Sequence, residues 1–232
     1  MDPSSSARRG RIPWIDAWRG SAVLVMLGWH FCWDLGLMKI IPLERMEAPA
    51  AVAVRYYIVC SFVILSGISA RLSRSNLRRG IKTLVCALIV TAVTWAVGDP
   101  AWFGILHLLG CCMVLYAWLG PRLQKLPELP LLAVCLILFL VLHEICYSVR
   151  VTVPGLWMFG LRTRTFYSSD WYPLFPWMFL FLCGTVAGSR VRDIRLRLPE
   201  LPFLRWLGSH ALWIYMLHQP VLMGLAWLIT KG

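Results

Sequence analysis

The sequence predicts an all-α polytopic membrane protein with about seven transmembrane helices. Of its 232 residues, 59% are hydrophobic and thirteen are tryptophan. Apolar runs of 17 to 25 residues recur along the chain with short links between them. A helix of about 20 residues is long enough to cross the hydrocarbon core of a bilayer. We therefore expect a single membrane domain over residues 12–232, preceded by a basic tail over residues 1–11.

The expected helices follow one another between recognisable breaks. The first four occupy residues 14–37, 50–70, 81–97 and 101–119. Gly98-Asp99-Pro100 ends the third, and Gly120-Pro121 closes the fourth. The remaining three occupy residues 131–148, 172–189 and 203–229. A longer connection, residues 149–171, precedes the sixth, and a basic loop rich in arginine precedes the seventh. Glycine and proline clusters of this kind mark turns, so they define the links between helices.

Lysines and arginines are distributed unevenly between alternate links. With Arg205 at the start of the last expected helix included, fifteen fall in the tail and in the links on its side of the membrane, and six fall on the opposite side. Cytoplasmic loops carry the excess of positive charge, so we expect the N-terminus in the cytoplasm and the C-terminus outside. The same bias explains the formal net charge of +12 without a nucleic-acid partner.

The eight cysteines lie mostly inside the apolar runs. They form no CxxC pair and no spacing typical of a metal site, so we expect reduced packing residues and no metal.

The segment 14–37 holds four ionisable residues, although it is apolar enough to cross a membrane. They are Asp16, Arg19, His30 and Asp34. Each costs roughly 2.5–3.5 kcal/mol on insertion scales, so the four need partners or a watery cavity. At 100° per residue they fall within about 60° around the helix axis, and about 16 Å separates Arg19 from His30. We expect the chemistry on this stripe, with Asp34 one turn from His30 to support acid–base or nucleophilic work.

The expected topology places His30 and Asp34 in the outer half of the bilayer, together with further ionisable groups. These further groups are His107, His143, Glu144 and Asp170. A structural alternative stays open for them, because intramembrane histidines often form interhelical hydrogen bonds; this applies also to His210 and His218. For Asp170 the structural alternative is a cap of the sixth helix, which it immediately precedes. For Asp16 and Arg19, three residues apart, it is an ion pair.

The basic loop of residues 71–82 has two interpretations. In the first it is a topology determinant that also touches anionic lipid. Alternatively, Arg78, Arg79 and Lys82 bind the phosphates of a cytoplasmic nucleotide-like ligand, because arginine forks match phosphate oxygens. No P-loop, GxGxxG motif or acidic magnesium-binding cluster accompanies them, which argues against nucleotide hydrolysis.

Six blocks in order resemble a known family. IDAWRG with the R-x10-H spacing from Arg19 to His30 resembles the transmembrane acyltransferase superfamily. SGIS (66–69), NLRRGIK (76–82), FGILHLLG (103–110), DWYPLFPW (170–177) and WIYMLHQP (213–220) narrow the match. Together they resemble the short bacterial relatives of the heparan-alpha-glucosaminide N-acetyltransferase catalytic domain, over residues 12–228.

The resemblance implies acyl transfer across the membrane. An acyl-CoA, usually acetyl-CoA, binds on the cytoplasmic side, and an extracytoplasmic hydroxyl or amine, such as that of a glycan, accepts the acyl group. Arg19 and His30 occupy the R-x10-H positions, with His30 as the essential histidine, either as a covalent acyl carrier or as a general base. The implied location is the bacterial inner membrane, and a homodimer is compatible with the resemblance.

The resemblance and the positions of the charged residues together predict a role for each candidate residue. We expect Arg19, Arg78, Arg79 and Lys82 to bind acetyl-CoA, and His30, Asp34 and Arg19 to act in catalysis. We expect His107, His143, Glu144 and Asp170 to bind the acceptor or orient His30. Two other classes also account for buried charges: a proton-coupled transporter or channel, and a non-catalytic scaffold or receptor. The missing internal repeat and the dense basic loop count against a transporter.

Overall fold

A computed structural model of the chain describes residues 12–191 and 201–231. The predicted tail, residues 1–11, and most of the predicted basic loop before the last helix lie outside the described residues. The chain divides into two compact units. The first unit comprises Met1–Phe62 and Arg195–Gly232, and the second comprises Val63–Ile194.

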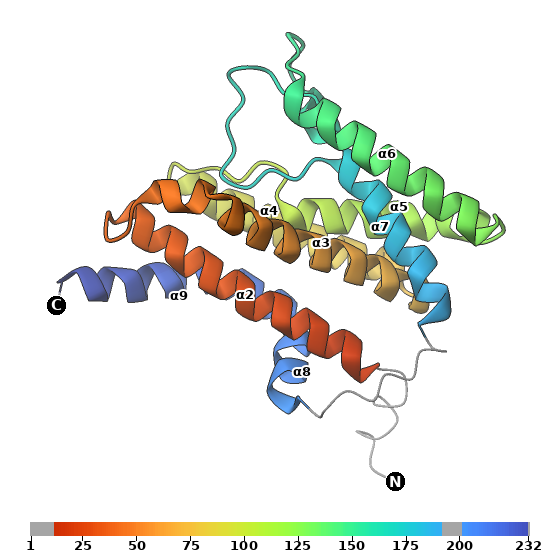
Figure 1. Cartoon of the computed structure of the whole chain (residues 1–232), viewed down its shortest axis with the longest axis horizontal. Coiled ribbons are helices and arrows are strands. Elements are labelled where there is room, and N and C mark those ends of the chain that lie inside the picture. The colour runs from red at the N-terminus through yellow and green to blue at the C-terminus, as the bar shows by residue number, and fades with distance from the viewer. Residues whose placement is uncertain (1–11, 192–200, 232) are drawn as a thin grey trace. The chain divides into compact units, whose positions relative to one another are not determined.

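The first unit joins the two ends of the chain. It contains α2 (Pro13–Leu37), the short 3-10 helix η1 (Leu43–Glu47), the first part of α3 (Pro49–Leu72), α8 (Pro202–Ser209) and α9 (Ala211–Lys231). Both α8 and α9 pack against α2 (Figure 1). The first predicted helix is thereby the centre of its unit.

The second unit is formed by consecutive helices. It contains the end of α3, α4 (Asn76–Ala96), α5 (Ile105–Leu123), α6 (Glu128–Ser148), the 3-10 helix η2 (Leu156–Phe159) and α7 (Leu174–Arg190). Helices α4 and α5 pack as one pair and α6 and α7 as another, and α5 also contacts α7 (Figure 1).

The all-helical membrane prediction is confirmed. Six of the described helices are long and apolar enough to cross a membrane, and α7 is a shorter apolar helix of 17 residues. Large apolar side chains are exposed along α4, α6 and α9, among them Leu88, Ile137 and Leu228. Lipid chains are the environment in which such faces are stable, because exposed apolar surface in water is unfavourable.

Glycines allow close contact between helices of the second unit. A side chain at Gly67 of α3 would collide with the backbone of Phe181 in α7, and one at Gly184 would collide with Ile64. Gly80 of α4 has the carbonyl oxygen of Gly110 in α5 at 3.0 Å from the position of an added Cβ. Small residues of this kind let membrane helices pack backbone to backbone.

The last predicted helix is divided in two. Residues 203–229 were expected to form one span, but α8 ends at Ser209 and α9 begins at Ala211. Between them, His210 has φ −108° and ψ 12°. Its Nδ1 lies 2.9 Å from the Trp206 carbonyl oxygen, and the Ser209 hydroxyl donates to the same oxygen at 2.8 Å. Side chains that bond to the local backbone in this way compete with helix continuation.

Candidate active site

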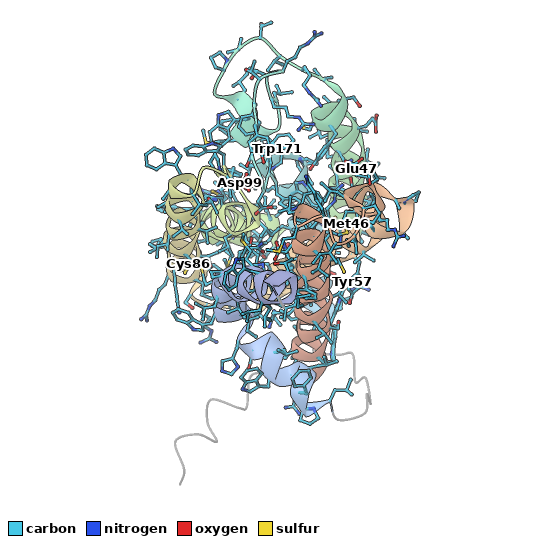
Figure 2. All side chains as sticks on the ribbon, turned by 90° about the vertical axis from the view of Figure 1, so that its left-hand side faces the viewer. Met46, Glu47, Tyr57, Cys86, Asp99 and Trp171 are labelled. Atoms are coloured by element: carbon cyan, nitrogen blue, oxygen red, sulfur yellow. The ribbon has the colours of Figure 1, made fainter. Side chains whose placement is uncertain are left out.

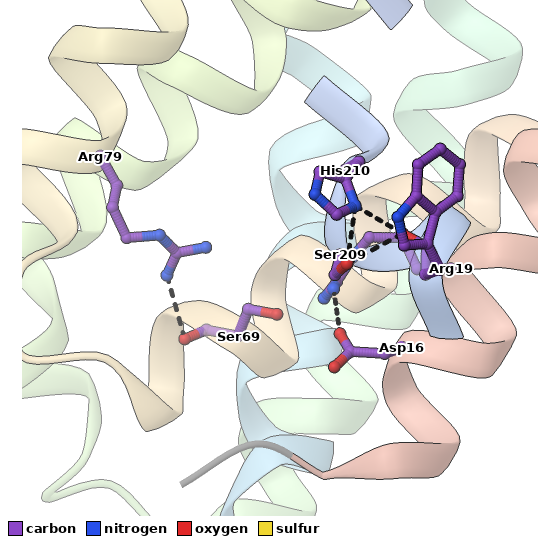
Figure 3. A network of polar contacts seen from close by, with 7 residues as sticks. Asp16, Arg19, Ser69, Arg79, Ser209 and His210 are labelled. Atoms are coloured by element: carbon purple, nitrogen blue, oxygen red, sulfur yellow. Dashed lines mark hydrogen bonds and ion pairs between the residues drawn. The ribbon is translucent and has the colours of Figure 1, made fainter. Parts of the chain in front are cut away.

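The N-terminal end of α2 is fixed by an ion pair and by contact with α8. Arg19 Nη1 lies 2.7 Å from Asp16 Oδ1, and both side chains are largely buried (Figure 3). A Cβ at Gly20 would collide with the carbonyl group of Leu204, and one at Gly208 would collide with that of Asp16. The IDAWRG block therefore supplies both the ion pair and the small residue that α8 packs against.

Two histidines of the first unit face each other. The ring of His30 on α2 and the ring of His218 on α9 lie 4.8 Å apart between centroids, with 64° between their planes. The Trp29 ring lies edge-on to His30, at 5.4 Å between centroids. Nδ1 of His218 lies 2.6 Å from the Tyr215 carbonyl oxygen one turn earlier in α9. The residue expected to be essential thus has a second imidazole beside it.

A second polar contact joins the same two helices one residue further along α9. Asp34 is only 1% exposed, and its Oδ1 accepts a hydrogen bond of 2.7 Å from Nε2 of Gln219. Its other oxygen, Oδ2, has no hydrogen-bond partner among the described residues. The carboxylate predicted to support His30 is therefore hydrogen-bonded to Gln219.

Asp170 in the second unit binds the start of a helix. Its Oδ2 accepts a hydrogen bond of 3.0 Å from the backbone N–H of Ile105, the first residue of α5. Gly104 precedes that residue, and a Cβ there would collide with the Asp170 carboxylate. The acidic side chain thus satisfies one of the free N–H groups at the end of α5, whereas capping of the sixth predicted helix was the structural alternative.

The connection around Asp170 is fastened to the link between α4 and α5. The Tyr167 hydroxyl donates to Asp99 Oδ1 at 2.8 Å, and the Ser169 hydroxyl donates to the Asp99 carbonyl oxygen at 3.1 Å. The bond to Asp99 raises the pKa of Tyr167 above its usual range. Figure 2 labels Asp99 and Trp171, which belong to these two segments. Arg162 lies over the Trp171 ring at 4.7 Å, and burial together with neighbouring Arg150 lowers the pKa of its guanidinium.

The two histidines of the second unit lie among aromatic rings. His107 on α5 stacks on Phe103 with 5.7 Å between centroids. His143 on α6 contacts Tyr147 at 4.6 Å and Trp177 at 5.8 Å between centroids. Glu144 is exposed and accepts a hydrogen bond of 2.8 Å from the Ser148 hydroxyl in its own helix. These contacts are compatible with structural roles as well as with the predicted acceptor binding.

The three basic residues of α4 lie in its first two turns. Arg78 and Lys82 are exposed, and Arg79 donates from Nη1 to the Ser69 carbonyl oxygen at 3.3 Å (Figure 3). One arginine is thus tied to the end of α3, while its two neighbours present charge at the surface of the second unit. Exposed cations one helical turn apart suit a polyanionic ligand or anionic lipid equally well.

The structure separates the predicted residues by unit. Arg19, His30 and Asp34 belong to the first unit; Arg78, Arg79, Lys82, His107, His143, Glu144 and Asp170 belong to the second. His218 had no assigned role in the sequence analysis, and Gln219 was not considered, yet both contact the polar stripe of α2. Their only signal in the sequence was the block WIYMLHQP, in which they stand side by side.

Comparison with known proteins gives one match. A family model described as heparan-alpha-glucosaminide N-acetyltransferase, catalytic, matches residues 11–220. The matched range includes all the predicted site residues as well as His218 and Gln219. Searches of curated proteins and of solved structures return no match.

Proposed function

Because the chain belongs to the heparan-alpha-glucosaminide N-acetyltransferase catalytic family, we propose that it is a membrane acyltransferase that uses acetyl-CoA as donor. The acceptor is an extracytoplasmic hydroxyl or amine, such as that of a glycan. The family match implies a transferase and the apolar helices an integral membrane protein. We propose, beyond this, the identities of the donor and the acceptor and the roles of individual residues.

The observation that supports the proposal most strongly is the setting of His30. Its imidazole lies on an apolar helix, in contact with a second imidazole and one turn from a buried carboxylate. A histidine held among such groups is suited to move protons or to accept an acyl group near neutral pH. His30 acts at the acyl carbon, either by taking the proton of the acceptor or by carrying the acyl group itself.

The donor is a polyanion at one end and a thioester at the other. Arg78 and Lys82, which are exposed on α4, bind its phosphates, and Arg79 takes part from its place beside Ser69. Arg19 is held by Asp16 and supports the donor from α2. The acceptor is bound by residues of the second unit: His107, His143, Glu144 and Asp170.

The proposal is tested with the full chain purified into lipid nanodiscs. Release of coenzyme A from acetyl-CoA is measured with water and with glucosamine as acceptors. His30→Ala should lower the rate about 10²–10⁴-fold, the usual effect of removing an acid–base group, while acetyl-CoA binding is retained. The matched control is His210→Ala, since His210 is exposed.

A protein that neither binds acetyl-CoA nor releases coenzyme A would contradict the proposal. A proton-coupled transporter, in contrast, would show solute flux that depends on a proton gradient and not on acetyl-CoA.

A further inference from the structure

The hydrogen bond at Nδ1 fixes the tautomer of His218. A carbonyl oxygen can only accept, so Nδ1 must carry the hydrogen that bonds to Tyr215 at 2.6 Å. In the neutral ring the other nitrogen, Nε2, then has a free lone pair. His218 is thus held as a hydrogen-bond acceptor at Nε2 by its own helix.

This acceptor nitrogen has no partner within the described parts of the chain, and His218 is 9% exposed. Two further oxygens in the contact between α2 and α9 are also buried without a hydrogen-bond partner among the described residues. They are Asp34 Oδ2 and Gln219 Oε1. All three atoms accept hydrogen bonds. Leaving one buried acceptor unsatisfied costs about 1–3 kcal/mol, so three together indicate a place where a ligand supplies donors.

The three atoms are close to the proposed reacting histidine. His218 contacts His30 directly, and Gln219 is bonded to Asp34, one helical turn from His30. The phosphates and the thioester carbonyl of acetyl-CoA present only acceptors, and the two amide N–H groups and the hydroxyl of its pantetheine arm are spread along a chain, whereas the three atoms belong to one contact between α2 and α9. A group rich in O–H or N–H bonds would satisfy all three, and that group is the acceptor of the transfer reaction.

We propose that His218, and not His30, takes the proton of the acceptor, and that Asp34 and Gln219 bind further O–H or N–H groups of the same molecule. This inference rests on the proposed function and adds three residues of the first unit to those proposed to bind the acceptor. The ligand is a neutral or cationic molecule with at least two such groups, as in an amino alcohol or a sugar.

The oxygen or nitrogen of the acceptor forms a bond to the acyl carbon while its proton passes to His218 Nε2. The bond from that carbon to its leaving group breaks with the electron pair on the leaving group. That group is the coenzyme A thiolate in direct transfer, or the His30 nitrogen if His30 carries the acyl group. The His218 imidazolium then returns the proton to the group that left.

The test uses substitutions that separate packing from proton transfer. His218→Asn keeps an N–H close to the Tyr215 carbonyl but has no basic nitrogen. His210→Asn is the matched control, because His210 Nδ1 makes the same kind of contact with the Trp206 carbonyl oxygen but is exposed. The full chain in nanodiscs is assayed for coenzyme A release with water and with glucosamine, and for acetyl-CoA binding by calorimetry.

We expect His218→Asn to lower the rate about 10²–10⁴-fold with acetyl-CoA affinity unchanged, and His210→Asn to match the unsubstituted protein. We also expect imidazole added to His218→Ala to restore turnover in proportion to its concentration. A rate for His218→Asn within about threefold of the unsubstituted protein would overturn the inference, because loss of a proton acceptor costs far more.

If His218→Asn loses acetyl-CoA binding as well as turnover, the imidazole experiment decides: restoration supports the inference, and none overturns it. An unsubstituted protein without acetyl-CoA binding or turnover would instead contradict the proposed function itself.

Discussion

Asp34 is the most deeply buried carboxylate among the described residues, and it depends on one amide for its hydrogen bond. A carboxylate in an apolar setting is costly unless donors surround it. Gln219 therefore stabilises the polar stripe of α2 from the neighbouring helix α9.

Gln219→Leu should destabilise the protein by about 1–3 kcal/mol, because Oδ1 of Asp34 loses its donor while remaining buried. Thermal unfolding in nanodiscs measures the change. The double variant Asp34→Leu/Gln219→Leu removes both partners and should be more stable than the sum of the two single effects predicts. Strictly additive effects would show that the two side chains are not coupled.

At the scale of the elements, α2 combines two kinds of glycine. Gly20 lies against the backbone of Leu204 in α8, whereas Gly28 has no atom within 4 Å of an added Cβ. The two positions belong to one helix, so they differ in packing and not in secondary structure.

Gly20→Ala should therefore destabilise the first unit by about 1–3 kcal/mol, since the new methyl group forces α8 away from α2. Gly28→Ala should be neutral or stabilising by up to about 1 kcal/mol, because alanine favours the helix. Thermal unfolding of the two variants side by side measures the difference. Equal effects would mean that α8 does not pack on Gly20.

Asp170 joins the connection 149–173 to the beginning of α5. Asp170→Ala should cost about 0.5–2 kcal/mol, as loss of a helix cap does, because the Ile105 N–H is left without its acceptor. Asp170→Asn keeps an acceptor oxygen and should retain most of the stability. Thermal unfolding gives the stabilities, and coenzyme A release from the stable Asp170→Asn variant shows whether the charge also serves acceptor binding. An asparagine variant as unstable as the alanine variant would contradict the capping role.

At the scale of the whole molecule, orientation in the membrane remains a prediction from charge. The count of fifteen lysines and arginines against six predicts an N-terminus in the cytoplasm, on the side where acyl-CoA is proposed to bind. A fluorescent protein fused to the N-terminus should be fluorescent, and an alkaline phosphatase fused after residue 231 should be active outside. The opposite result would place the basic residues of α4 on the wrong side for the donor.

The helices could largely be predicted from the sequence because each is set by a local apolar run. The segment 14–37 is observed as Pro13–Leu37, and 131–148 as Glu128–Ser148. The break at His210 was missed because the apolar pattern continues across it, although the backbone of His210 has non-helical φ and ψ angles.

The candidate site could be predicted only in part, for a physical reason. Asp16, Arg19, His30 and Asp34 share a face of one helix, so periodicity alone brings them together. Gln219 lies 185 positions from Asp34 along the chain, and no local pattern connects them. The partners of the stripe are set by the packing of α9 on α2, which the sequence does not display.

The central claim is that His30 is the reacting histidine of an acetyl-CoA-dependent transferase. The most direct measurement is transfer of radiolabelled acetyl from acetyl-CoA to glucosamine by the full chain in nanodiscs, comparing His30→Ala with Gly28→Ala, a substitution in the same helix with free space around it. The account predicts transfer by the unsubstituted protein and by Gly28→Ala, and a loss of about 10²–10⁴-fold in His30→Ala with acetyl-CoA still bound. Equal transfer by both variants would contradict it.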